Sequence, residues 1–158
     1  MRTRLPFIAA VVVIALSVAA SQIISVDAGA RSVSTEDRLS IEQPKGSGQW
    51  KGRDVAVEYS YSINQGQMDI SGKIRFASFF IGYSRLQDFR LGAIFVDEKG
   101  TVLEEIGLTT DRGSFDPIPF SRTIKLPPNA VSMAFSYQGD AVQSGMGGVT
   151  SFSFYPVH

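Results

Sequence analysis

The stretch from Asp88 to Leu108, DFRLGAIFVDEKGTVLEEIGL, constrains the fold of this chain more than any other segment. Two apolar runs flank a short polar segment that ends in Gly100. Glycine enters the left-handed backbone region at little cost, so a type I turn followed by a left-handed residue closes a β-hairpin here. The run before the turn is apolar on both faces near its end, which is typical of a central strand and places Phe95 in the core. The run after the turn has three apolar residues expected to share one face: Val102, Ile106 and Leu108.

Five further runs alternate between apolar and polar residues, as strands with one buried face do. They are Asp54–Ile63, Met68–Phe76, Phe120–Leu126, Val131–Tyr137 and Val149–Tyr155. With the central hairpin they predict about seven strands, joined by turns at short intervals. The predicted fold class is all-β: an antiparallel two-sheet sandwich of the immunoglobulin or fibronectin-III type over residues 52–158. The longest loops are expected at 109–119 and 139–148.

The N-terminus carries the pattern of a targeting segment. Arg2 and Arg4 precede an apolar run from Leu5 to Ala20. A short basic region followed by an apolar one is typical of a secretory signal peptide. Small residues at 18–20 and at 28–30 offer two cleavage sites.

An uncleaved membrane anchor is the alternative to a signal peptide for residues 1–30. The segment 5–26 contains no charged residue, and it is long enough to cross a hydrocarbon core of about 30 Å. Both alternatives predict that the folded part is exported, to the periplasm or to the outer face of the cytoplasmic membrane.

Residues 31–51 are polar and lack a hydrophobic period, which predicts a linker between the targeting segment and the domain. Within it, the run RLSIE at 38–42 could pair as a short edge strand. Trp50 is the only tryptophan of the chain. Its indole could serve as a stacking platform for a ligand, or it could pack against the end of the sandwich.

The composition excludes several classes of function. The chain has no cysteine, which rules out disulfides, thiolate metal sites, thiol catalysis and a lipid anchor on cysteine. Fifteen Lys and Arg residues balance fifteen Asp and Glu residues. Nucleic acid requires a concentrated basic surface, so this balance predicts no nucleic-acid partner.

The titratable residues do not form a catalytic or metal-binding pattern. His158 is the only histidine and ends the chain, where a backbone usually frays. The acidic pairs 97–98 and 104–105 are neighbours on predicted strands or turns, and neighbours in a strand point to opposite faces. Asp111 and Asp116 do not have the spacing of a calcium-binding EF-hand loop. We therefore expect no catalytic residue, no metal and no cofactor.

Three segments in this order, GKIRF, FRLGAIFVDEKGTVLEE and FSRTIKLPPNAVSMAFSY, resemble exported bacterial modules of the FxLYD and immunoglobulin-like kind. Residues 94–102 match the "fyD-x-x-G-x-V" hairpin of those modules, and residues 126–130 match their "lxPg" turn. The FxLYD tetrad itself is absent from the sequence. The resemblance implies a sandwich in an envelope protein, generally of unknown or binding function, and it carries over no site residues.

These patterns predict a non-catalytic binding or interaction module of the bacterial cell envelope. Its expected partner is another envelope protein or a surface polymer, because loops on a rigid sandwich commonly carry recognition. The alternative is a sandwich that binds carbohydrate or another small ligand through an aromatic face or through the glycine-rich stretch 139–148. The candidate ligand-binding residues are Trp50, Tyr83 and Arg85.

Overall fold

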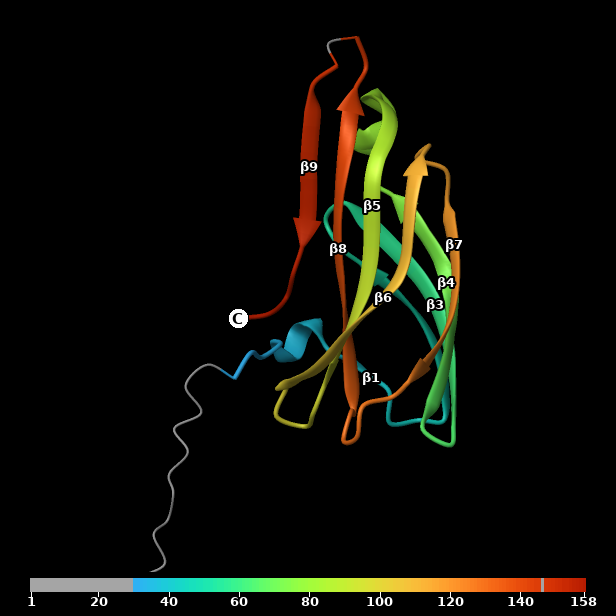
Figure 1. Cartoon of the computed structure of the whole chain (residues 1–158), viewed down its shortest axis with the longest axis vertical. Helices are drawn as coiled ribbons and strands as arrows, with labels where there is room; N and C mark the ends of the chain where they lie inside the picture. Colours follow the sequence, from blue (N-terminus) through green and yellow to red (C-terminus); the bar gives the residue numbers. More distant parts are fainter. Residues whose placement is uncertain (1–29, 146) are drawn as a thin grey trace, which may run out of the picture.

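The computed structural model describes residues 30–145 and 147–158, which form two antiparallel β-sheets (Figure 1). The sheets pack against each other through their apolar faces, which confirms the predicted β-sandwich. The predicted signal peptide or anchor falls, except for Ala30, outside the described residues. Within the described part of the chain, no helix is both long and apolar enough to cross a membrane.

The larger sheet has the order β1–β8–β5–β6, and β9 also pairs with β8. Because β5 occupies one edge of β8, β1 and β9 share the other edge. There β1 pairs with residues 132–133 and β9 with residues 137–142. The strands of this sheet are β1 (Leu39–Ser40), β5 (Tyr83–Val96), β6 (Val102–Gly113), β8 (Ser132–Gln143) and β9 (Val149–Phe154).

The smaller sheet has the order β2–β3–β4–β7 and is antiparallel throughout. Two short 3₁₀ helices complete the described structure: η1 (Thr35–Asp37) precedes β1, and η2 (Ser78–Gly82) connects the smaller sheet to the larger one. The strands of the smaller sheet are β2 (Lys45–Lys51), β3 (Val55–Asn64), β4 (Gln67–Phe76) and β7 (Ile118–Lys125).

The main core fills the space between the two sheets. Alternate residues of β3 and β4 point into it, as the apolar–polar alternation of these strands predicts. From the larger sheet, Phe89, Phe95 and Phe135 contribute rings that are fully buried. The prediction that Phe95 lies in the core is thus confirmed.

Strand β2 lies where the sequence predicts a linker, so that prediction is wrong for residues 45–51. The inward positions of β2 include Gly46 and Gly48, which face Tyr61 and Tyr59 on β3. A Cβ atom at Gly46 would lie 2.7 Å from the Tyr61 ring, and one at Gly48 would lie 2.9 Å from the Tyr59 hydroxyl. The two tyrosine rings therefore pack directly on the backbone of the two β2 glycines, where a side chain would collide with them. Because glycine carries no side chain, the alternation that marks a strand is invisible in this sequence.

The two longest loops are shorter in the structure than the sequence predicts. Strand β6 runs to Gly113 and β8 to Gln143, so the connections are residues 114–117 and 144–148 rather than 109–119 and 139–148. The long strand β5 supplies pairing partners for both extensions. With β1 and β2 added, the described residues contain nine strands rather than about seven.

The hairpin between β5 and β6 turns as predicted. Gly100 has a φ of 86°, in the left-handed region, and its N–H donates to the carbonyl of Asp97 at 2.9 Å. The Asp97 carboxylate accepts hydrogen bonds from the backbone N–H groups of Thr101, at 2.8 Å, and Lys99, at 2.9 Å. These bonds, that from Thr101 above all, hold the pKa of Asp97 below its ordinary value.

A β-bulge follows this turn and changes the face of one residue. The pairing register shifts between Phe95, which lies opposite Glu104, and Val96, which lies opposite Val102. Ile106 and Leu108 belong to the main core, whereas Val102 packs against a second, smaller core. The prediction that all three share one face is therefore wrong, because a bulge reverses the alternation.

The second core lies on the outer face of the larger sheet and is closed by both ends of the domain. Val33 inserts there against Ile94, Val96 and Ala134. The N–H of Val33 donates to the carbonyl of Gly100 at 2.9 Å, which pins the segment to the β5–β6 turn. On the other side, Ser32 and His158 exchange backbone hydrogen bonds of 3.2 and 2.9 Å. Residues 31–33 thus form a strap between the hairpin turn and the C-terminus.

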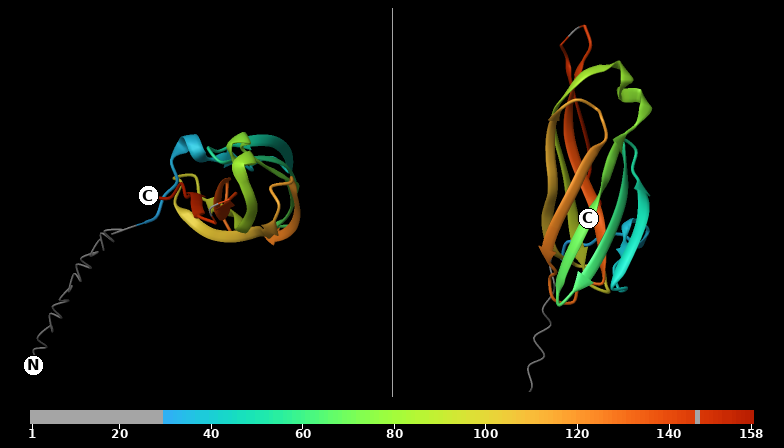
Figure 2. Two further views of the ribbon diagram at one scale, coloured as in Figure 1. Left: turned by 90° about the horizontal axis from the view of Figure 1, so that it is seen from above. Right: turned by 90° about the vertical axis from the view of Figure 1, so that its right-hand side faces the viewer.

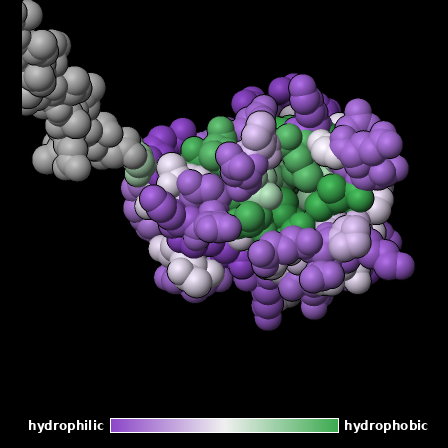
Figure 3. Space-filling model, turned by 90° about the horizontal axis from the view of Figure 1, so that it is seen from below, coloured by the Kyte–Doolittle hydropathy of each residue, from purple (hydrophilic) through white to green (hydrophobic). Residues whose placement is uncertain are grey.

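The sandwich has two different ends (Figures 1 and 2). The upper end carries η2 and the connections 114–117 and 144–148. The lower end carries the turns at 65–66 and 97–100 and the β7–β8 connection at 126–131. Seen from below, apolar side chains occupy the centre of the lower end and hydrophilic ones surround them (Figure 3). Partly buried residues of the lower-end elements that pack against the main core are Leu39, Ile63, Leu126 and Ala130.

Candidate binding surfaces

Trp50 is partly buried and packs inside the sandwich. Its indole lies 5.4 Å from the Phe154 ring, 5.6 Å from the Phe135 ring and 6.1 Å from the Tyr137 ring, measured between centroids. These contacts join the edge strand β2 to β8 and β9. Of the two roles considered for Trp50, the geometry favours packing over a ligand platform, because three aromatic neighbours already surround the indole.

Tyr83 and Arg85 lie at the start of β5, near the upper end. The Tyr83 ring is partly buried beside Phe80, with centroids 5.5 Å apart, and its hydroxyl lies 3.4 Å from Oγ1 of Thr150. Arg85 is exposed. Among the described residues, no ring contact joins Tyr83 to Trp50.

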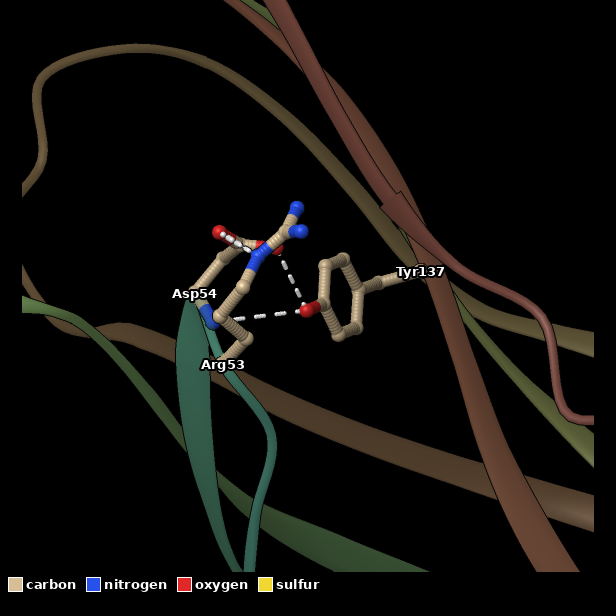
Figure 4. A network of polar contacts seen from close by, with 3 residues as sticks. All are labelled: Arg53, Asp54 and Tyr137. Carbon is tan, nitrogen blue, oxygen red and sulfur yellow. Dashed lines mark hydrogen bonds and ion pairs between the residues drawn. The ribbon is translucent and has the colours of Figure 1, made fainter.

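A buried polar network links the two sheets at residues that the sequence analysis did not single out (Figure 4). Asp54 is 2% exposed, and its Oδ2 accepts a hydrogen bond of 2.7 Å from the Tyr137 hydroxyl. The guanidinium of Arg53 donates to Oδ1 at 3.0 Å and to Oδ2 at 3.1 Å. No local pattern signals this network, because Tyr137 reaches Asp54 from a strand of the other sheet.

The network keeps the tyrosine protonated. Burial, together with the hydrogen bond to Asp54, raises the pKa of Tyr137 to about 12. The adjacent carboxylate raises the pKa of Arg53 above its already high value. Both oxygens of Asp54 have donors, and no buried side-chain polar atom of the described residues lacks a partner. The arrangement is that of a structural clamp between the sheets.

The upper end carries three exposed large apolar side chains, Phe79 and Ile81 on η2 and Val149 at the start of β9, which we together call the apolar tip. These side chains are 52%, 87% and 55% exposed. Between the first two, Phe80 is buried and packs against Phe115 and Phe152, with centroids 5.0 and 4.7 Å apart. Because Phe80 anchors η2 in the core, its neighbours on either side must project into solvent. The backbone N–H of Ser144 approaches the carbonyl of Gly82 at 3.4 Å, linking the β8–β9 connection to this helix.

The outer face of the larger sheet contains a groove above the second core, which we call the outer-face groove. It has a volume of about 340 Å³. Small residues form its floor, and its lining includes Tyr155, which is 48% exposed. Its polar walls carry Arg90, Glu105 and Gln138.

The outer face of the smaller sheet is polar. A row of directly paired serines crosses all four of its strands: Ser47, Ser60, Ser71 and Ser121. Two charged residues beside the row, Arg75 and Glu58, form an ion pair of 3.0 Å. A polar, self-paired face of this kind is the ordinary solvent face of a sandwich.

The acidic residues weighed as possible metal ligands remain apart. Asp111 lies on β6, and Asp116 accepts a hydrogen bond of 2.7 Å from Ser114 in the following connection. Within residues 30–145 and 147–158, no three histidine, aspartate or glutamate side chains come together in a group that could hold a metal ion.

No family model, curated protein or solved structure matches this chain.

Proposed function

We propose that this chain is a non-catalytic binding module of the cell envelope that recognises another protein through the apolar tip. The observation that carries the proposal is the exposure of Phe79, Ile81 and Val149 at the upper end of the sandwich. Several large apolar side chains exposed at one end of a domain are a candidate interaction site.

Backbone hydrogen bonds and ring packing hold η2, the part of the tip that carries Phe79 and Ile81. The N–H of Ala77 donates to the carbonyl of Asp54 at 2.9 Å, and the N–H of Phe80 donates to the carbonyl of Ala77 at 3.1 Å. The Phe79 ring lies against the Phe80 ring, with centroids 4.3 Å apart. A prearranged tip loses less conformational entropy on binding than a flexible loop does, which favours affinity.

The chemistry of the tip fits a protein partner better than a polysaccharide. The side chains of Phe79, Ile81 and Val149 carry no hydrogen-bonding group, so sugar hydroxyls pressed against them would lose water without replacement. A protruding apolar tip instead fits a pocket lined by apolar side chains, where burial itself supplies the free energy.

The envelope location rests on residues 1–30, whose basic and apolar pattern predicts export. The resemblance to immunoglobulin-like exported modules likewise stays a prediction from the sequence. Residue 30 joins the strap near the hairpin turn at the lower end, and the apolar tip lies at the opposite end (Figure 1). This placement supports a module that presents the tip away from its attachment point.

Site-specific photocrosslinking in the producing cell tests the proposal. A benzophenone amino acid replaces Ile81 in the tip or, as the control, Leu103, an exposed residue of β6 near the lower end. We expect one protein to crosslink reproducibly at position 81 and not at position 103. Excess wild-type chain should compete with this product, whereas the Phe79→Ser/Val149→Ser chain should not.

Two outcomes would contradict a protein partner at the tip. One is crosslinking at position 81 to lipid only. The other is an equal protein yield from positions 81 and 103, which would indicate contact without a preferred surface.

A further inference from the structure

The outer-face groove has the chemistry of a ligand site that is separate from the apolar tip. Its floor is formed where Gly92 on β5 pairs with Gly107 on β6 and with Ser136 on β8. A Cβ atom at Gly107 would meet no other atom within 4 Å. Because Gly107 has no side chain, this position is open space, and no neighbouring side chain fills it.

Tyr155 is fixed beside this space although half of it is exposed. Its hydroxyl donates a hydrogen bond to Oε1 of Glu105, and the same oxygen forms an ion pair with Arg31. The guanidinium of Arg31 also lies over the Tyr155 ring, 5.7 Å from its centroid. Cation–π contact and hydrogen bonding thus hold an exposed aromatic ring in one orientation at the side of the groove.

The groove walls offer free hydrogen-bonding groups of both kinds. Oε2 of Glu105 and the side chains of Gln138 and Ser153 have no hydrogen-bond partner among the described residues. Arg90 pairs with Asp88 through Nε at 3.2 Å. A guanidinium has five N–H donors, so this pair does not use all of them. Carboxylate oxygen accepts, guanidinium nitrogen donates, and amide and hydroxyl groups do both.

The lining of the groove carries no net charge, because its two charged residues, Arg90 and Glu105, have opposite signs. Glu105 also pairs with Arg31, and Arg90 shares Asp88 with Arg112. A charged ligand would therefore gain no net electrostatic attraction from the groove. The binding of a neutral ligand does not depend on such attraction. The volume of about 340 Å³ lies at the lower end of the range known for small-molecule sites, about 300–1,000 Å³.

We propose that the outer-face groove binds a neutral hexose unit of a glycan. A pyranose ring has an apolar face that can lie against the Tyr155 ring, and its hydroxyls both donate and accept hydrogen bonds. The groove presents an aromatic ring, a free carboxylate oxygen, an amide and guanidinium nitrogens around one space, which matches these two properties together. The site is independent of the apolar tip and goes beyond the proposed protein partner.

Nuclear magnetic resonance titration of the ¹⁵N-labelled full chain in detergent tests the inference. The probes are four neutral sugars: D-glucose, D-galactose, D-mannose and N-acetyl-D-glucosamine. We expect at least one to cause saturable shifts centred on the amides of Gly92, Gly107 and Gln138. The Tyr155→Ala change should weaken binding by about tenfold or more, as expected for the loss of a strong aromatic contact.

Two further variants separate a ligand site from a structural effect. Gly107→Val fills the floor where the structure leaves open space, so it should abolish binding while the spectrum stays that of the folded chain. Lys73→Ala, on the other sheet, serves as the matched surface control and should bind like the wild type.

Three results would overturn the hexose site. The first is the absence of saturable shifts with all four sugars. The second is saturable shifts centred on the smaller sheet. The third is unchanged affinity in a folded Tyr155→Ala or Gly107→Val chain. None of these results bears on the apolar tip, so the two proposals fail independently.

Discussion

The hydroxyl of Tyr137 on β8 donates a hydrogen bond of 2.7 Å to the carboxylate of Asp54, which lies 83 residues earlier in the chain and belongs to the other half of the sandwich. The contact is buried, and the same hydroxyl lies 3.4 Å from the backbone nitrogen of Asp54. This pair connects the start of β3 to the middle of the larger sheet. It is a buried polar contact between two faces that meet largely through apolar side chains.

Removing the Tyr137 hydroxyl should destabilise the domain. Tyr137→Phe leaves a buried carboxylate short of one donor, which typically costs about 1–3 kcal/mol in the free energy of unfolding. Urea denaturation followed by circular dichroism measures the loss. Tyr59→Phe is the matched control, because the Tyr59 hydroxyl has no hydrogen bond in the described structure, and it should change stability by less than about 0.5 kcal/mol. Equal losses in the two variants would contradict a clamp.

The same tyrosine should make stability depend on alkaline pH. The pKa of Tyr137 is raised from 10.0 to about 12 in the folded chain. Between these values the unfolded chain has lost a proton that the folded chain keeps, so the free energy of unfolding falls as pH rises. The contribution is fully present below pH 10 and is lost as pH passes about 12, in total roughly 3 kcal/mol.

Denaturation midpoints measured across this pH interval test the effect. Tyr137→Phe should show a shallower decline than the wild type. Part of the decline should remain, because burial also raises the pKa values of Tyr59 and Tyr61. Parallel declines in wild type and variant would show that Tyr137 does not carry the titration.

Two glycines in the strands should differ in how much stability the domain loses when each is replaced by alanine. At Gly72 on β4, a Cβ atom would collide with the backbone oxygen of Glu58 and would lie 2.8 Å from the Phe120 ring. Gly72→Ala should therefore cost about 1–3 kcal/mol, as overpacking does. Gly107→Ala meets open space and should change the free energy of unfolding by less than about 0.5 kcal/mol. Thermal denaturation of both variants gives the comparison. Similar losses of stability would mean that the strand propensity of the residue, rather than the space around it, determines the effect of the substitution.

Two phenylalanines, Phe95 in the core and Phe79 in the apolar tip, should differ in their contribution to stability. Phe95 is fully buried, whereas Phe79 is half exposed. Phe95→Ala should cost about 3–5 kcal/mol, as large core truncations do. Phe79→Ala should cost about 0.5 kcal/mol or less if the ring serves recognition rather than stability. A loss of several kcal/mol for Phe79→Ala in urea denaturation would show that the tip is part of the core.

The local pattern of the sequence determines most strands of this protein. Alternation with a period of two predicts β3, β4, β7 and β9, because side chains of a strand point alternately to its two faces. The polar segment ending in Gly100 predicts the central hairpin, because it contains the residue that the left-handed position requires. Both signals depend only on neighbours in the chain, so they can be read without the tertiary structure.

The tertiary structure decides which residues meet across the chain. Tyr59 and Tyr61 turn the glycines of β2 into a paired strand, and the strap at 31–33 becomes part of the domain through contacts with both the hairpin turn and the C-terminus. The buried pair of Asp54 and Tyr137 and the groove beside Tyr155 arise in the same way. Each combines residues from strands far apart in sequence, and strand order and register are set by packing over the whole sandwich rather than by any local period.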